Sequence, residues 1–465
     1  MVEATIILIS LAPFVVAGVG LLVFGWPASR VGVATLAVAV VGALALGASG
    51  FGGALVGGLG TSGQVLVVLF GGLLLYNVLA AGGAIEGVSR YLGRLEPDPV
   101  ALAAGVVVGV APFFESVTGF GVAVVISAPI LLAAGLSPLK AAVLASWGQC
   151  AVPWGALGVG TVIGADLAGM GFGTLSDASA FLSVPLFPVY GIAAVALAGG
   201  WSGVRRRGVE AAALGLAAGA GTLGTSLYLS PELSGAVGGM AATALFLAWR
   251  RSRARGVPWR SLMPYVLLLG LILAANAVGG FGSEGITGLV LDGPAVPLLV
   301  SSLFAAALFG VSGNGLGEAV RGTVRQWVPT AGAVLTFVLA GAVVADGGAA
   351  AVLAEQASRF GWLYPAVLPV LGAFGGALAG SNAASNALFM PLQVEAARGL
   401  GMPETLAAAS QNVSGSHASL LAPQRVVLAA TATGLVGREG EITRKAIAPV
   451  AVSVIVLAAI GMVAG

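Results

Sequence analysis

Long apolar segments separated by short polar stretches run through the whole chain. A helix that crosses a bilayer needs about 20 consecutive, mostly apolar residues. Segments of about that length predict full spans at 4–24, 31–49, 64–83, 138–163, 180–200, 209–229, 231–248, 261–280, 295–311, 328–345, 404–424 and 446–464. The expected fold class is therefore an all-α polytopic membrane protein with about 12 transmembrane helices.

Two further apolar stretches, 100–134 and 365–399, are too long for one helix and are interrupted in the middle. The interruptions read Glu115-Ser-Val-Thr-Gly-Phe-Gly and Gly380-Ser-Asn-Ala-Ala-Ser-Asn. Each stretch predicts a re-entrant helical hairpin. Its polar tip must lie against protein or a water-filled cavity, because lipid cannot satisfy unpaired backbone groups.

The two interrupted stretches belong to an internal repeat. Ser116 and Ser381 lie 265 positions apart, and so do Pro138 and Pro403. The same offset carries four spans of the first half close to the spans at 295–311, 328–345, 404–424 and 446–464. Paired, interrupted segments of this kind indicate the substrate site of a transporter. The predicted divisions are a first repeat over 1–208, connecting helices and a basic loop over 209–260, and a second repeat over 261–465.

Basic residues orient the spans. Two clusters, which the positive-inside rule puts in the cytoplasm, are Arg205 to Arg207 and then Arg250, Arg251, Arg253, Arg255 and Arg260. The count places both termini outside the cytoplasm, with Arg359 and Arg398 as exceptions. It works only if each hairpin enters and leaves on one side, so the halves have opposite orientation. That arrangement is an inverted-topology repeat.

Composition narrows the function. Of the residues, 58% are hydrophobic and 8% are charged, whereas soluble domains carry roughly 25% charged residues. The net charge of +2 gives no indication of nucleic-acid binding. A single cysteine, Cys150, and one histidine exclude disulfides and the common zinc sites, so no cofactor or metal is expected. We interpret 4–24 as a retained span, because only Glu3 precedes it as a charge and a secretory signal starts with cations.

Glu115 is the one acid well inside a membrane segment. Such a carboxyl group costs a few kcal/mol or more to bury, which makes it a functional candidate. We expect it to carry a coupled proton; the alternative is a hydrogen-bonded tip residue that never titrates. His417 is a secondary proton candidate, because imidazole titrates near neutral pH, and a satisfied interior histidine is the alternative.

Hydroxyl, amide and glycine residues at the tips predict a site for a small carboxylate, since helix amino termini and short polar side chains bind anions. The candidate substrate residues are Ser116, Thr118, Gly119, Ser381, Asn382, Ser385, Asn386, Gln411, Asn412 and Ser414. The alternatives are a plain helix kink and polar bonds across helices. Arg425 is either an anchor at the membrane interface or the counter-ion of an anionic substrate, and the sequence favours the anchor.

At these residues the chain resembles the lactate permease family. The resemblance covers most of the chain and is densest at Glu115 to Gly121, Trp154 to Gly158, Gly380 to Phe389, and Gln411 to Gln424 followed by Ala432 to Gly437. It implies proton-coupled uptake of a small 2-hydroxymonocarboxylate such as lactate or glycolate. It also implies roles for Glu115, Ser381, Ser385 and Asn386. The family resembles, more distantly, elevator-type carboxylate carriers with inverted repeats and two hairpins.

The chain departs from the family pattern at three positions. Asn382 stands where an Asp is common, Ser419 lies near a common Lys, and Arg425 replaces a small residue after the Pro-Gln pair. Losing an acid and a base together suggests that an internal pair was removed. The departures bear on whether lactate itself is the substrate and on the stoichiometry of transport. A small carboxylate stays the expected class of substrate.

Other classes compete with a proton-coupled carrier. Carbonyl groups and Asn or Ser side chains at the tips would also suit a sodium-coupled carrier. An anion channel would need a continuous polar pore. A membrane enzyme would need a catalytic set, and Glu115 has no evident partner acid, so no enzyme is expected. The expected partners are a small carboxylate, protons or Na⁺, and the lipid of the cell membrane; a homodimer stays open.

Overall fold

The computed structural model describes residues 2–119, 121–250, 256–277 and 293–464. Within these residues every regular element is helical, and ten helices are long and apolar enough to cross a bilayer. The chain is therefore a multi-pass helical membrane protein, as its hydropathy pattern predicts.

The first half of the chain contains the helices up to the kinked α11. They are α1 (Val2–Gly18), η1 (Val19–Val23), α2 (Ala28–Ala45), α3 (Gly52–Ala81), α4 (Ala84–Leu95), α5 (Pro99–Gly105), η2 (Val106–Val110), α6 (Ala111–Thr118), α7 (Val122–Ala133), α8 (Pro138–Trp147), η3 (Val152–Trp154), α9 (Val159–Leu167), α10 (Phe172–Ser183) and α11 (Leu186–Tyr228).

The remaining helices of the described chain follow the turn after α11. They are η4 (Pro231–Leu233), α12 (Ser234–Trp249), α13 (Trp259–Ala277), α15 (Ala295–Phe309), α16 (Gly313–Asp346), α17 (Ala349–Ser358), η5 (Gly361–Leu363), α18 (Tyr364–Ala379), α19 (Asn382–Gly399), α20 (Glu404–Ala418), η6 (Ser419–Leu421), α21 (Pro423–Thr433) and α22 (Glu439–Ala464).

The two interrupted stretches are broken where the sequence predicts. In the first, α5, η2 and α6 form one run that ends at Thr118, and α7 begins at Val122. In the second, α18 ends at Ala379 and α19 begins at Asn382. Residues 100–118 are buried without exception. This run is therefore enclosed by protein, although its composition alone would suit a lipid-facing span.

Two predicted spans, 138–163 and 404–424, are not continuous helices: the first is broken in its middle, after Trp147, and the second near its end, after Ala418. Between α8 and α9 the backbone unwinds, and Ala156 and Leu157 adopt the uncommon positive φ angles of 42° and 57°. After α20 a short turn leads to Pro423, which begins α21. Proline suits a first helical turn because its missing N–H would be unpaired there anyway.

The predicted loop that separates spans 180–200 and 209–229 is also wrong. α11 consists of two helices that meet at Gly200, where φ is 64° and ψ is −159°, so the break between the two predicted spans falls at Gly200 and the residues after it are helical. The three arginines at 205–207 therefore lie on helix just after the kink rather than in a loop. The short helices α4 and α17, at matching places in the two halves, were not predicted because they are too short to span.

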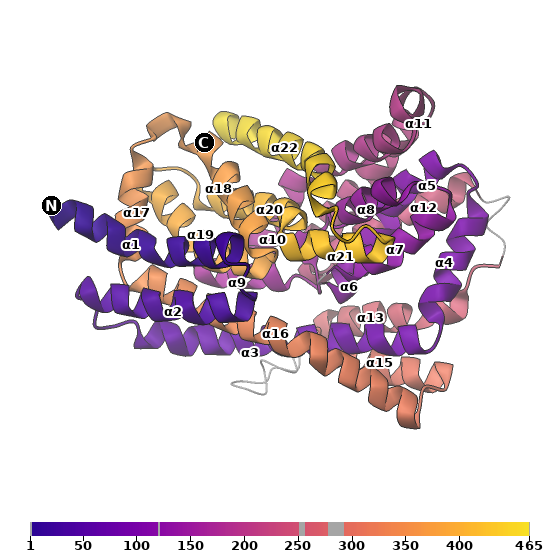
Figure 1. The fold of residues 1–465 in the computed structure, drawn as a ribbon, viewed down its shortest axis with the longest axis horizontal. Helices are drawn as coiled ribbons and strands as arrows, with labels where there is room; N and C mark the ends of the chain where they lie inside the picture. The colour runs from indigo at the N-terminus through magenta and orange to yellow at the C-terminus, as the bar shows by residue number, and fades with distance from the viewer. Residues whose placement is uncertain (1, 120, 251–255, 278–292, 465) are drawn as a thin grey trace.

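The helices form two layers (Figure 1). The lower layer consists of α2, α3, α13, α15 and α16, in which α16 packs on both α2 and α3. The upper layer contains α8, α11, α12, α18, α20 and α22, with α18 packed on α20 and α11 on α12. Contacts of α19 with α16, and of α9 with α3, join the layers. The helix breaks consequently lie where the two layers meet.

Candidate functional site

The two polar tips meet around a buried ion pair. Glu115 lies in the last turn of α6 and is 1% exposed, and Arg425 lies in the first turn of α21 and is 6% exposed. Nη1 of Arg425 is 3.5 Å from Oε1 of Glu115. A buried charge without a partner is costly, so each of these side chains allows the other to be buried.

Arg425 also donates hydrogen bonds at two other helix breaks. Its Nε donates to the carbonyl oxygen of Gly380 at 3.0 Å, and its Nη1 donates to Oε1 of Gln149 at 2.8 Å. One guanidinium thus links the first tip, the second tip and the break after α8. The sequence-based interpretation of Arg425 as an interface anchor is wrong, because the side chain is buried among these partners. In the sequence Glu115 indicates that some cation must lie nearby, since a buried acid requires one, but it does not identify which.

The first tip is shaped by glycine. The backbone N–H of Gly121 donates to both carboxylate oxygens of Glu115, at 3.3 and 3.2 Å. Gly121 has a φ of +83°, and a Cβ there would lie 2.8 Å from Nη1 of Arg425. Gly119, with a φ of +65°, ends α6 against Ala156. Only glycine accommodates both the conformation and the close contact.

The predicted hydroxyls of the first tip bond to their own helix. Ser116 donates to the carbonyl oxygen of Pro112 at 2.8 Å, and Thr118 donates to that of Phe114 at 2.6 Å. Both side chains are fully buried. In this arrangement they stabilise the last turns of α6.

A cavity of about 340 Å³ lies between the second tip and the lower layer. One wall contains Gly380, Ser381, Gln424 and Arg425, and the opposite wall comes from α2 and α16. Arg425 is the charged residue among the described residues that line it. This volume is at the lower end of the range of small-molecule pockets, roughly 300–1,000 Å³. The cavity therefore suits a small anion.

Behind the cavity, buried amides tie the second tip to its neighbours. Oδ1 of Asn412 accepts bonds from Nδ2 of Asn382 at 2.7 Å and from Nδ2 of Asn386 at 2.8 Å. Its Nδ2 donates to the hydroxyls of Thr161 at 3.0 Å and Ser179 at 2.8 Å. Asn412 thereby joins α19 and α20 to α9 and α10.

A second set of bonds continues this network. Nε2 of Gln411 donates to the Ser385 hydroxyl at 3.1 Å, and its Oε1 accepts from Nε2 of Gln393 at 2.5 Å. The Ser414 hydroxyl donates to the carbonyl oxygen of Ser410 at 2.6 Å. The candidate substrate residues therefore separate into two groups: Ser381 lines the cavity, and the amides lie buried behind it.

His417 lies apart from the ion pair. Its Nε2 is 3.1 Å from the carbonyl oxygen of Cys150, and its Nδ1 is 3.2 Å from the Ser453 hydroxyl. Its ring packs edge-on against Tyr190. Both nitrogens have partners, which fits the interpretation as a satisfied interior histidine.

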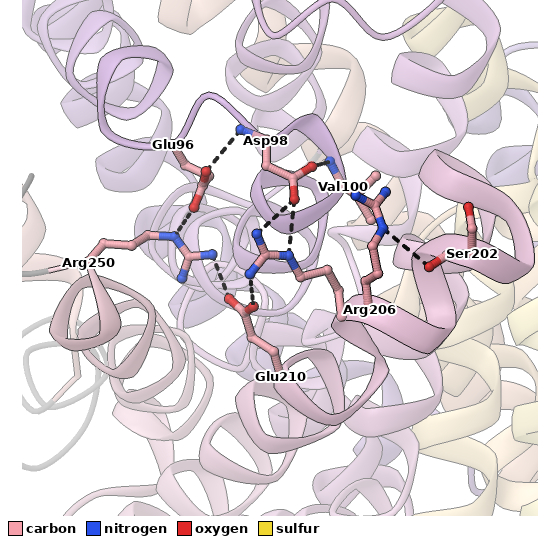
Figure 2. Close-up of polar contacts among 8 residues, drawn as sticks. Glu96, Asp98, Val100, Ser202, Arg206, Glu210 and Arg250 are labelled. Atoms are coloured by element: carbon pink, nitrogen blue, oxygen red, sulfur yellow. Dashed lines mark hydrogen bonds and ion pairs between the residues drawn. The ribbon is translucent and has the colours of Figure 1, made fainter.

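A second charged cluster joins the segment before α5 to α11 and α12 (Figure 2). Arg250 pairs with Glu96 and, at 2.6 Å, with Glu210. Arg207 pairs with Glu210 at 3.0 Å and with Asp98 at 2.9 Å. Burial of Asp98 alone would raise its pKa, but its bonds with the Val100 N–H and Arg207 leave that pKa below the ordinary value. The sequence marks these arginines as topology signals and gives no sign of their pairing.

A polytopic membrane protein with broken helices beside a small cavity that contains a buried arginine has the construction of a secondary transporter. The family model for L-lactate permease matches residues 6–255 and 271–464. The chain therefore belongs to the L-lactate permease family, which confirms the resemblance seen in the sequence.

Several relatives are similar to this chain over most of their length. The L-lactate permease of Streptococcus iniae is 23% identical over 376 residues, covering 73% of this chain and 78% of the relative. Glycolate permease GlcA of Escherichia coli K12 is 25% identical over 454 residues, covering 81% and 80%. A solved structure, the YdaH transporter of Alcanivorax borkumensis, is 15% identical with a TM-score of 0.45, covering 88% of this chain and 86% of that one.

Proposed function

We propose that the protein is a secondary active transporter that moves a small 2-hydroxymonocarboxylate, such as L-lactate or glycolate, together with a proton. Membership of the L-lactate permease family supports transport of small hydroxycarboxylates. The observation that carries the finer proposal is the Glu115–Arg425 pair beside a small cavity, since it offers a cation for the substrate and an acid for the proton.

In this proposal the substrate carboxylate binds between Arg425 and the amino terminus of α19. Ser381 is the N-cap residue of α19 and its side chain makes no capping bond, so its hydroxyl is available to a ligand. Unpaired N–H groups at a helix start favour an anion. Charge-assisted bonds from a guanidinium are among the stronger hydrogen bonds in proteins.

Coupling follows from the competition of two carboxylates for one guanidinium. When Glu115 is charged, it neutralises Arg425, and a second anion beside the pair is repelled. Protonation of Glu115 removes that repulsion and releases Arg425 for the substrate. By linkage, bound substrate favours the protonated acid to the same extent. Substrate and proton would therefore bind and leave together.

The architecture suits alternating access. Helices recur at the offset of 265 through both halves, as in α4 (84–95) and α17 (349–358). We propose that the halves form an inverted-topology repeat, that 100–134 and 365–399 are re-entrant hairpins, and that the upper layer moves past the lower one in an elevator-type cycle. A cavity between the layers supports this proposal, because movement of one layer would carry it across the membrane.

Sodium coupling is the second candidate. Oδ1 of Asn382 and Oε1 of Gln393 are buried without a hydrogen-bond partner among the described residues. Oxygen atoms of this kind are potential cation ligands, although the described hydrogen bonds of these two side chains go to amides and a backbone carbonyl and not to an acid.

Transport by purified protein in liposomes tests the proposal. The panel is lactate, glycolate, pyruvate, acetate and a dicarboxylate, each with and without an inward proton gradient. Accumulation of lactate or glycolate driven by the gradient is the expected result. Accumulation that needs a sodium jump at fixed pH would select the sodium carrier. Flux that never exceeds equilibration would indicate a channel and refute the carrier.

A further inference from the structure

An apolar groove of about 310 Å³ lies where α4, α6, α12 and α13 come together. Its inner wall contains Phe113, Phe114 and Tyr265, whose rings pack edge-on with centroids 5.2 to 5.6 Å apart. The groove therefore has a rigid aromatic wall and almost no polar group that could orient a water-soluble ligand.

The groove opens at the surface of the helix bundle. Met240, Trp259 and Val266 line it and are 41%, 66% and 59% exposed. In a membrane-spanning chain such a mouth faces lipid or the interface, where tryptophan is enriched. An acyl chain from the surrounding leaflet can therefore enter from the side.

One short helix, α4, provides a wall of the groove with its buried face and carries two arginines on its opposite, exposed face. Val88 and Leu92 on the buried face of α4 line the groove. Arg90 and Arg94 lie on the exposed part of the same helix, with Glu86 as the one acid beside them. Amphipathic helices of this kind lie in the membrane interface. Basic residues there attract anionic headgroups.

We propose that this groove binds one acyl chain of an anionic phospholipid, whose headgroup contacts Arg90 and Arg94. The apolar lining selects a hydrocarbon chain, and the charge on α4 selects the headgroup. The site is separate from the carboxylate cavity, so it stands whether or not the transport proposal holds.

Native mass spectrometry of the purified full chain provides the test. Dioleoyl phosphatidylglycerol and dioleoyl phosphatidylcholine have the same chains and differ in headgroup charge. We expect saturable binding of the anionic lipid, stronger than that of the zwitterionic lipid by about thirtyfold, as two basic residues near the surface would provide. Equal binding of the two lipids would overturn the headgroup assignment and with it the proposal.

A matched pair of variants tests where the acyl chain of the lipid binds. Ala244 is exposed and lines the groove, so Ala244→Phe fills it; Ala248→Phe lies one turn further along α12, outside the groove. The first change should reduce anionic-lipid binding about tenfold and the second should leave it unchanged, as the apolar burial of a chain predicts. Normal binding by Ala244→Phe, or equal loss in both variants, would overturn the proposal.

A second matched pair tests the headgroup. Arg90→Gln with Arg94→Gln should abolish the preference for the anionic lipid while chain binding persists. Arg321 and Arg325 have the same spacing on α16, are also exposed, and do not line the groove. Arg321→Gln with Arg325→Gln should keep the preference. If the two double variants behave alike, Arg90 and Arg94 do not bind the headgroup.

Discussion

At the scale of single residues, the candidate site depends on how Glu115 and Arg425 share charge. Glu115 could be recognised from the sequence because an acid at membrane depth is rare and costly. Arg425 could not, since only the folded chain shows that a residue 310 positions later reaches the first tip. The amides could be recognised as a polar group but not divided into cavity-lining and buried residues, because that division depends on packing.

The role of Glu115 is tested by Glu115→Gln, which keeps shape and hydrogen-bonding capacity but cannot titrate. The variant should bind substrate and support counterflow exchange, yet lose accumulation driven by a proton gradient. Uptake of labelled lactate or glycolate into liposomes measures both activities. Normal accumulation by the variant would show that another group carries the coupled proton, and His417 would be tested next.

A double-mutant cycle tests the ion pair itself. Arg425→Gln leaves Glu115 buried without its cation, which should destabilise the protein by about 3–5 kcal/mol. Adding Glu115→Gln removes the stranded charge and should restore much of the thermal stability, while substrate binding stays weak because the guanidinium is absent. Thermal unfolding in detergent and substrate binding are measured on all four proteins. Additive losses of stability would show that the two side chains are not coupled.

The division of the polar residues predicts different defects for two substitutions. Ser381→Ala removes a hydroxyl from the cavity and should weaken substrate binding about ten- to a hundredfold, the effect of 1.5–3 kcal/mol, with little loss of folded protein. Asn412→Ala removes the acceptor of the Asn382 amide and one of the two acceptors of the Asn386 amide, and should lower the yield of folded protein instead. Binding measurements and size-exclusion profiles separate the two effects. A stable Asn412→Ala protein with weakened binding would place that amide at the substrate.

At the scale of helices, the sequence predicts where a helical span exists better than it predicts whether that span is one continuous helix. The spans at 31–49 and 295–311 correspond to α2 and α15 within a few residues. Mean hydropathy cannot detect the break after α8, because the unwound residues between 148 and 158 are nearly as apolar as a helix. At Gly200 the sequence does predict the end of a span, but it does not show that the arginine-rich residues that follow continue as helix.

The start of α5 offers a pH-dependent test at this scale. Asp98 caps α5 by accepting from the Val100 N–H at 3.0 Å and pairs with Arg207. Its folded pKa is lowered from 3.8, so its stabilising contribution is complete above the unfolded pKa and is lost as pH falls through the folded pKa. Asp98→Asn keeps the cap and removes the charge. Wild type should unfold at a higher temperature at pH 7, and the difference should shrink below about pH 4. A difference that is constant with pH would show that the charge contributes nothing.

At the scale of the whole molecule, the two layers explain why the site lies where it does. Each broken helix belongs to the upper layer or its border, and the cavity opens toward α2 and α16 of the lower layer. The repeat in the sequence predicted that the breaks come in pairs. It could not predict the cavity, which depends on how helices from distant parts of the chain pack.

The orientation of the molecule can be tested on the second part of α11. After the kink at Gly200 this helix runs to Tyr228, and a helix of that extent is about 40 Å long, enough to cross the roughly 30 Å hydrocarbon core. Arg205 near its start and Tyr228 at its end are both exposed. The positive-inside rule puts Arg205 in the cytoplasm and Tyr228 outside.

Cysteines introduced at these two positions in a Cys150→Ala background should therefore react with impermeant reagents from opposite sides of the membrane. The background protein, which lacks cysteine, should stay unlabelled. Labelling of both positions from one side would contradict the span, and labelling of Arg205→Cys from outside would contradict the orientation that the positive-inside rule predicts.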